Sequence, residues 1–274
     1  MAHLSQSEVL ANRVQEALVG SEIVLLNTIM NLTEDVRPGR SSVQLPIASG
    51  LAATDVPTDG SDATGSDMAT TGDTLNLDQH KEVHTYIKLK DWKQASVDLE
   101  TQFGEDAPKL MAEQFETLIG TTLETSGFSG HDFASGAEDS YTIGNVTEAK
   151  RLLDTAKVPK KDRYLAVDAT GMSIIAAWTE FQDGSKSLSD EALKEGVVSQ
   201  IKGFKVVQSE DISNNKMVCY HKSAVAFAFQ GEIDYDKEYQ ASKSRTYLSI
   251  KALYGCKKLD GGKRQVVITQ TNAS

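Results

Sequence analysis

Two histidines, His80 and His84, stand four residues apart and are the nearest approach in this sequence to a metal-binding pattern. On a helix, histidines at this spacing can share one zinc ion, as in the motif H-E-x-x-H. Here the residue directly after His80 is Lys81 and not Glu. The residues around them alternate between apolar and polar types, which predicts a strand. Along a strand, side chains four residues apart lie on one face about 13 Å apart, too far to bind one ion. We therefore predict no metal site at this pair.

Two glycine-containing stretches are similar to functional motifs but fail their requirements. The stretch from Gly127 to His131 reads Gly-Phe-Ser-Gly-His, whereas a nucleophile elbow needs glycine at the fifth position. Gly261-Gly262-Lys263 lacks the upstream glycine and the Ser or Thr of a phosphate-binding loop, and it predicts a hairpin turn. The sequence thus predicts no catalytic residue and no cofactor, and hence a protein that is not an enzyme.

Charge and cysteine content exclude further classes. The chain has 39 acidic and 28 basic residues, a formal net charge of −11, so we expect any contact with nucleic acid to be weak and non-specific. The two cysteines, Cys219 and Cys256, have no motif spacing, which predicts free buried thiols in a reducing compartment. The longest strongly apolar run, 23–26, is far shorter than the roughly 18 residues of a membrane span. No secretory signal precedes it, so we expect a cytoplasmic location and no membrane partner.

The residue pattern in the first half of the chain predicts extended segments. An amphipathic helix is expected from Ser7 to Gly20, within an N-terminal arm outside the compact core. A conventional helical hairpin is the alternative for these first forty residues. Two segments of period two, 42–47 and 83–89, are expected to pair as a hairpin. Between them, 48–79 is a long loop without Lys or Arg. Because a two-stranded projection is only marginally stable alone, we expect a neighbouring subunit to cover it.

The second half predicts an α+β domain. A helix over 96–103 is interrupted by Gly104 and restarts at Asp106, with Pro108 in its first turn, to form the longest helix of the chain. Its apolar stripe comprises Leu110, Met111, Phe115, Leu118, Ile119 and Leu123. A loop is expected over 126–140. Helices are expected over 146–157, capped by Asn145, and over 172–178, with strands at 164–167, 197–201, 204–207, 216–220, 246–254 and 265–269.

This order of elements resembles the tailed-phage major capsid protein family, which has the Hong Kong 97 fold, over nearly the whole chain. Three segments are similar to family usage: VPKKDRYLAV at 158–167, GVVSQIKGFKVVQS at 196–209 with a turn at Gly203, and HKSAVAFA at 221–228. None of these motifs is catalytic.

The resemblance implies an N-terminal arm at 1–40, an extended hairpin loop at 41–91, and a spine helix with the start of the peripheral domain at 92–143. The axial domain and the remaining peripheral strands would follow at 144–274. It also implies an icosahedral or prolate shell around double-stranded DNA, built of hexamers and pentamers in the host bacterial cytoplasm. Scaffold, portal and cement proteins would be further partners. The implied assembly residues are Val43, Leu45, Ile47, Val83, Ile87, Met111, Phe115, Gly203 and Phe204.

Two alternatives stay open at this point. A shell of a cellular nanocompartment would share the fold but enclose a cargo enzyme. An acidic enzyme could use the loop 48–79 as a lid over an active site. Some family members crosslink their shells through a lysine of the extended loop, but no lysine occurs here before Lys81, which speaks against that bond.

Overall fold

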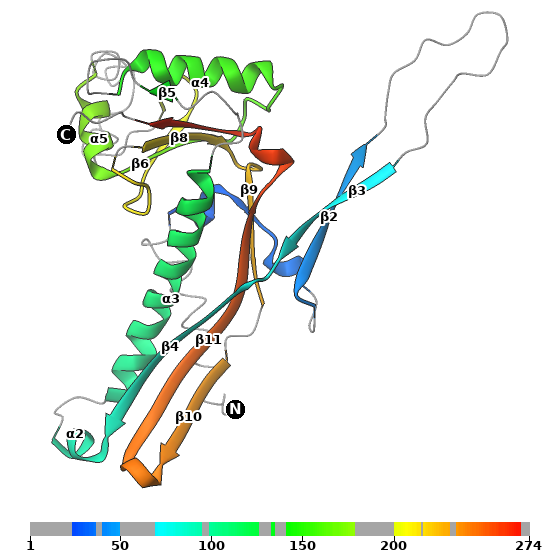
Figure 1. Ribbon diagram of the computed structural model, residues 1–274. Coiled ribbons are helices and arrows are strands. Elements are labelled where there is room, and N and C mark those ends of the chain that lie inside the picture. Colours follow the sequence, from blue (N-terminus) through cyan, green and yellow to red (C-terminus); the bar gives the residue numbers. More distant parts are fainter. Residues whose placement is uncertain are drawn as a thin grey trace, which may run out of the picture.

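The structure is a computed structural model, and it describes residues 24–36, 40–49, 69–94, 99–125, 133–134, 141–178, 200–214, 216–230 and 234–269. These residues form three β-sheets with helices packed against two of them. Figure 1 shows an elongated molecule with a lobe at one end and a long ribbon of strands below it. A two-stranded hairpin projects from the side of this ribbon.

The long sheet is organised around β11 (Arg245–Lys258). Its first half pairs antiparallel with β10 (Asp234–Gln240) on one edge, and its residues 245–254 pair antiparallel with β4 (Gln79–Lys88) on the other. Its second half pairs with β9 (Val225–Phe229), which in turn pairs parallel with β1 (Met30–Asn31). One strand thus runs through the whole ribbon and ties the N-terminal segment to the centre of the chain.

The helix α3 (Leu99–Leu123) lies along this sheet as one continuous element. The predicted interruption at Gly104 is wrong, since both Gly104 and Pro108 lie inside the helix. An internal proline costs about 3 kcal/mol. The apolar stripe of the helix, which includes the fully buried Met111 and Phe115, packs on the sheet and outweighs that cost. A short helix, α2 (Leu89–Gln94), precedes α3 at the far end of the ribbon.

The lobe contains the second sheet, whose order is β5-β12-β8-β6-β7. Helices α4 (Ile143–Thr155) and α5 (Ala169–Ala176) pack against it. The cap of α4 is Thr142, whose hydroxyl accepts from the backbone N–H of Asn145, so the predicted cap at Asn145 is wrong. The helix starts earlier because Thr142 already satisfies a free N–H of its first turn. The strands are β5 (Phe133–Ala134), β6 (Arg163–Val167), β7 (Lys205–Gln208), β8 (Lys216–His221) and β12 (Gln265–Thr269).

The projecting hairpin consists of β2 (Ser42–Ser49) and β3 (Ala69–Asn76). The predicted pairing of β2 with the segment 83–89 is therefore wrong, because that segment belongs to β4 and pairs with β11. Period-two alternation identifies a strand but not its partner, and Thr, Gly and Asp in β3 conceal a strand inside the predicted loop 48–79.

Several other predictions need correction. Residues 24–36 pack into the core through Leu25, Leu26 and Ile29, so this part of the predicted arm is not an arm. The predicted helix at 7–20 and the stretch 127–131 lie outside the described residues. Of the predicted strand 197–201, only the end is described, where Ile201 forms an isolated bridge with Phe204. The turn at Gly261 and Gly262 joins β11 to β12 of another sheet and closes no hairpin.

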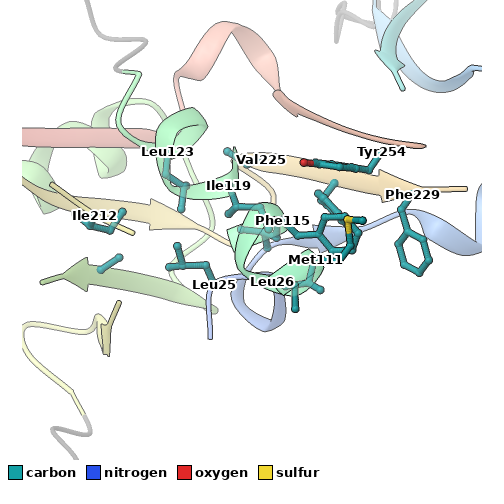
Figure 2. Close-up of a cluster of buried hydrophobic side chains, with 14 of the residues drawn as sticks. Leu25, Leu26, Met111, Phe115, Ile119, Leu123, Ile212, Val225, Phe229 and Tyr254 are labelled. Atoms are coloured by element: carbon teal, nitrogen blue, oxygen red, sulfur yellow. The ribbon is translucent and has the colours of Figure 1, made fainter. Parts of the chain in front are cut away.

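The core is built of three clusters of buried side chains. The first lies between α3 and the long sheet and includes Phe115, Phe227 and Tyr254, whose ring centroids lie 4.5–6.2 Å apart. Figure 2 shows Phe115 and Tyr254 within this cluster. The second fills the lobe. The third lies under the base of the hairpin. Both cysteines are free thiols as predicted, but the predicted burial is confirmed for Cys219 alone, because Cys256 is partly exposed.

Candidate assembly site

The two histidines at metal-binding spacing, His80 and His84, belong to no metal site among the described residues. His80 and His84 lie on β4, as predicted, and His84 packs against the rings of Tyr86 and Tyr247, each at 5.8 Å. Within the described ranges, no group of three or more His, Cys, Asp or Glu is placed to hold a metal ion. Burial raises the pKa of Cys256 to about 12, so its thiol is protonated near neutral pH. In the same part of the chain, no helix combines the length and the apolar character that a membrane span requires.

The hairpin is fixed to the body of the molecule by its base. Val43 of β2 and Leu75 of β3 are buried against Ala226 and Ala228 of β9. The other residues of β9, including Phe227, face α3. This strand is therefore buried on both faces, and it holds the hairpin on one side and the long helix on the other.

Close backbone contact reinforces this base. Any side chain at Gly255 of β11 would collide with the backbone carbonyl of Asn76, so only glycine lets β3 approach β11. Beside it, the Lys257 ammonium pairs with the Asp73 carboxylate and donates to the Thr74 carbonyl at 2.8 Å. The direction in which β2 and β3 leave the molecule is thereby set by packing, charge and a steric requirement.

A buried carboxylate anchors the N-terminal segment to α3. Glu116, only 3% exposed, accepts from the backbone N–H of Leu25 at 2.8 Å and of Leu26 at 2.9 Å. These groups begin the 3-10 helix Leu26–Thr28, so the carboxylate caps it from another element. Burial raises the pKa of Glu116, and the bonds from the backbone oppose that rise. Thr28 then bonds the hydroxyl of Tyr220 in β8 at 2.6 Å, which joins the segment to the lobe.

The C-terminal end of α3 connects the ribbon to the lobe. Thr117 donates to the Asp211 carboxylate at 2.8 Å. Glu124 accepts from the Ser213 backbone N–H at 2.5 Å and pairs with Lys216 at 2.7 Å. Burial raises the pKa of Glu124, but these two partners outweigh it and the pKa is lowered overall. The helix therefore holds both parts of the molecule at defined positions.

The predicted assembly residues occupy several elements. Five of them are buried within this chain and shape its core: Val43, Ile87, Met111, Phe115 and Phe204. Leu45 and Val83 are partly buried and pack against the third and first clusters, and Ile47 lies in β2 opposite Thr71. Gly203 has φ +93° in a turn, as predicted. Their role in assembly remains a prediction. Within one chain, the buried members of this set form the core that positions the elements at the surface.

Motif searching missed Glu116 and Gly255. Glu116 stands within the buried face of α3, between Ala112 and Gly120 at helical spacing. A charged residue on an otherwise buried helical face is a signal that could have been used. Gly255 lies inside a strand, directly after the apolar run Ala252-Leu253-Tyr254, and glycine within a strand signals close backbone approach.

Comparison with known proteins gives the family. The family model described as phage capsid protein matches residues 121–269. No match was found among curated proteins. A structure from Mycobacterium phage Che8 is similar with TM-score 0.70 at 18% identity, covering 90% of each chain. The capsid structure of cyanophage P-SCSP1u gives TM-score 0.70 at 17% identity, covering 92% of this chain and 89% of the other.

A third similar structure comes from Pyrococcus furiosus. The virus-like particle from Pyrococcus furiosus gives TM-score 0.58 at 12% identity, covering 97% of this chain and 100% of the other. At these identities the structures show a shared fold, while the family match extends over more than half of the sequence. The chain belongs to the phage capsid protein family.

Proposed function

We propose that this chain is the major capsid protein of a tailed bacteriophage and builds an icosahedral or prolate shell around double-stranded DNA. The family match carries the proposal, because it covers the C-terminal end of α3, the lobe and most of the long sheet. The elongated shape and the projecting hairpin suit a subunit that makes wide contacts with its neighbours.

The same proposal assigns each part of the structure to a part of such a subunit. We assign the lobe to the axial domain, α3 to the spine helix, the long sheet to the peripheral domain, and β2 with β3 to the extended loop. The axial domain would close hexamers and pentamers through repeated head-to-tail contacts. The boundary of the arm moves to before residue 24, because residues 24–36 belong to the core.

The hairpin supports a role in assembly. Beyond its base, β2 and β3 are paired only with each other among the described residues. An isolated two-stranded ribbon is marginally stable in water, so a surface of another molecule must complete it. A neighbouring copy supplies such a surface at the required stoichiometry.

Partners follow from the same proposal. Scaffold, portal and cement proteins would act with the capsid protein in the cytoplasm of the host bacterium, and the finished subunit would reside in the virion. With a formal charge of −11, the subunit would contact packaged DNA weakly and without sequence preference.

The second candidate is a shell that encloses a cargo enzyme in a cell. The virus-like particle from Pyrococcus furiosus supports it, because that similar structure is named for a cellular organism and not for a phage. The two candidates differ in contents and not in fold.

Sedimentation of the recombinant chain, followed by analysis of the contents, tests both candidates. Fast-sedimenting particles are expected, and a chain that stays monomeric with a co-expressed scaffold would contradict both. In particles from infected or lysogenic cells, nuclease-protected DNA supports the capsid. A co-purifying enzyme without DNA supports the compartment.

A further inference from the structure

Basic side chains gather at one end of the sheet in the lobe. We define this basic rim as residues 157–163, 202–205, 221–223 and 263–264, which lie where β6, β7 and β12 begin and where β8 ends. The rim has one acidic residue, Asp162, and nine basic residues: Lys157, Lys160, Lys161, Arg163, Lys202, Lys205, Lys222, Lys263 and Arg264. Its charge is therefore opposite to that of the whole chain, whose formal net charge is −11.

The backbone joins the four segments of the rim into one surface. Lys222 donates its backbone N–H to the Asp162 carbonyl at 3.0 Å. The next contact follows directly, since His221 donates its backbone N–H to the Arg264 carbonyl at 3.1 Å. The Lys205 ammonium lies 3.5 Å from the Asp162 carboxylate, which adds the start of β7. Segments that are far apart in the sequence thus place their basic side chains side by side.

A buried arginine holds the most basic of these segments, 157–163. Arg163 is only 3% exposed and donates to the carbonyls of Val158 at 2.7 Å and Pro159 at 2.9 Å. Its guanidinium also pairs with the Asp154 carboxylate at 2.7 Å. The segment is therefore folded around one neutralised charge, and three lysines remain exposed on its outside: Lys157, Lys160 and Lys161.

Hydrogen bonds also fix the position of Arg264. Its guanidinium donates to the Ser223 hydroxyl at 2.8 Å, and this hydroxyl lies 2.8 Å from Nδ1 of His221. The Ser223 backbone N–H donates to the same ring nitrogen at 3.1 Å, so Nδ1 is an acceptor. Burial and the charge of Arg264 lower the pKa of His221, which is therefore neutral near neutral pH. A ligand of the rim meets a guanidinium that is already ordered, which reduces the entropic cost of binding.

The lysines of the rim lack acidic partners in the part of the chain that the structure describes. Asp154 and Asp162 are already paired, with Arg163 and Lys205 respectively. Six exposed lysines form no ion pair with a described side chain: Lys157, Lys160, Lys161, Lys202, Lys222 and Lys263. This concentration of unbalanced positive charge indicates a binding surface for an anion.

The composition of the rim favours nucleic acid over a protein as that anion. The large apolar side chains that are exposed in the described residues all lie in β4, α2, α3 or β10, away from the rim: Tyr86, Leu89, Leu110 and Tyr239. The centres of protein interfaces are enriched in aromatic residues and depleted of lysine, which is the reverse of what the rim presents. Lysine and arginine without apolar neighbours are typical of contacts to phosphate groups.

We propose that the basic rim binds the phosphate backbone of nucleic acid without reading its base sequence. The identification of this nucleic acid as packaged DNA rests on the proposed function, and it places the rim on the inner face of the shell. Each rim neutralises only a few phosphates, so a single subunit binds weakly. A shell presents many rims, and their contacts with one DNA molecule add up.

Binding of a short fluorescent DNA duplex to the unassembled full-length chain, measured by anisotropy over a salt series, tests the rim itself. The variant Lys160→Gln, Lys161→Gln, Lys222→Gln should bind more weakly, and its slope of log affinity against log salt should be smaller by about 3, because three phosphate contacts are lost. Its melting temperature should be that of the wild type, since all three lysines are exposed. Duplexes of different base sequence should bind alike.

The matched control removes three exposed lysines of the ribbon instead: Lys81→Gln, Lys88→Gln, Lys109→Gln. It should keep the affinity and the salt slope of the wild type. An equal loss in the control, or no binding of duplex to the wild type at low salt, would overturn the proposal. Tighter binding of poly-glutamate than of duplex would identify an acidic protein as the partner and would also overturn it.

Lysine acetylation of particles with and without DNA tests the place of the rim in the shell. Lys160, Lys161 and Lys222 should be protected only in filled particles, whereas Lys81 should react equally in both. Equal reactivity of the rim lysines in both kinds of particle would overturn the identification of packaged DNA as the ligand. A wild-type chain that binds duplex but forms no particles would contradict the proposed function and would support the affinity of the rim for phosphate.

Discussion

The carboxylate of Glu116 accepts a hydrogen bond from the backbone N–H of Leu25, 91 residues away in sequence, at 2.8 Å. The contact is buried and lies where the N-terminal segment meets the long helix and the lobe. It fixes the start of the described N-terminal segment against the long helix.

Replacing this carboxylate should therefore destabilise the subunit. In Glu116→Gln, the amide nitrogen would face a backbone N–H and leave a buried donor without an acceptor, at a cost of about 1–3 kcal/mol. Urea unfolding of the dissociated subunit measures the loss. The control is Glu113→Gln on the exposed side of the same helix, which should change the free energy of unfolding little. Equal stability of the two variants would contradict the anchor.

Stability should also depend on pH through this group. Because the pKa of Glu116 is raised above its ordinary value of 4.5, the folded chain binds the proton more tightly than the unfolded chain does. Its contribution is fully present below pH 4.5 and is lost as pH rises through the raised pKa. Glu124 has a lowered pKa, so its contribution is lost as pH falls through that value. The test measures the free energy of unfolding of Glu116→Gln, Glu124→Gln and the wild type over a pH series. The difference from the wild type should change with pH in opposite directions for the two variants. The same pH dependence in both variants would contradict these pKa assignments.

The base of the hairpin should tolerate no side chain at Gly255. In Gly255→Ala the new methyl group meets the Asn76 carbonyl, so β3 must shift, at about 1–3 kcal/mol. Thermal melting measures the effect. Gly144→Ala is the matched control, because its methyl group has ordinary contacts and lies in helix α4, where alanine is favourable. If both variants have the same melting temperature, the close approach of β3 to β11 does not contribute to stability.

The turn at Gly203 should depend on backbone freedom alone. An added Cβ would have only the Lys150 ammonium nearby, at 3.9 Å, but φ is +93°. Gly203→Val should therefore lower stability by about 1–2 kcal/mol or more. The neighbouring Lys202 also has positive φ, at 48°, so Lys202→Gly should keep or raise the melting temperature. Unchanged melting of Gly203→Val would contradict the turn.

The segment between β2 and β3 should be required for assembly and not for folding. Removing all of 48–79 would also remove Leu75 and Leu77, which are buried under the hairpin, so the fold would suffer. Replacing only 50–68 by Asn-Gly retains this base and supplies a two-residue turn. The variant should melt like the wild type and form no particles in sedimentation. Normal particles would contradict the role of the hairpin.

Local chemistry made part of the fold predictable. Strands β6, β8 and β12 were predicted to within one residue at each end, because their apolar runs are bounded by turn residues. The left-handed turn at Gly203 and the strand assignment of His80 and His84 are confirmed for the same reason. These features depend on neighbours in sequence.

Pairing across long distances was not predictable from these patterns. The partner of β2 is a strand with few apolar residues, and β9 is an unbroken apolar run, VAFAF, whose double burial is known only once the hairpin and α3 are placed. Glu116 was missed because its partners are backbone groups, which carry no sequence signal. The prediction of α3 failed at Gly104 because local propensity was outweighed by burial on the sheet.

Negative-stain electron microscopy of the recombinant wild-type chain, alone and with a co-expressed scaffold, tests whether this chain builds a shell. Closed shells, or rings of five and six subunits, are expected at protein concentrations where assembly is favoured. Only monomers in every condition, with an intact fold by circular dichroism, would contradict the claim that this chain is a shell subunit.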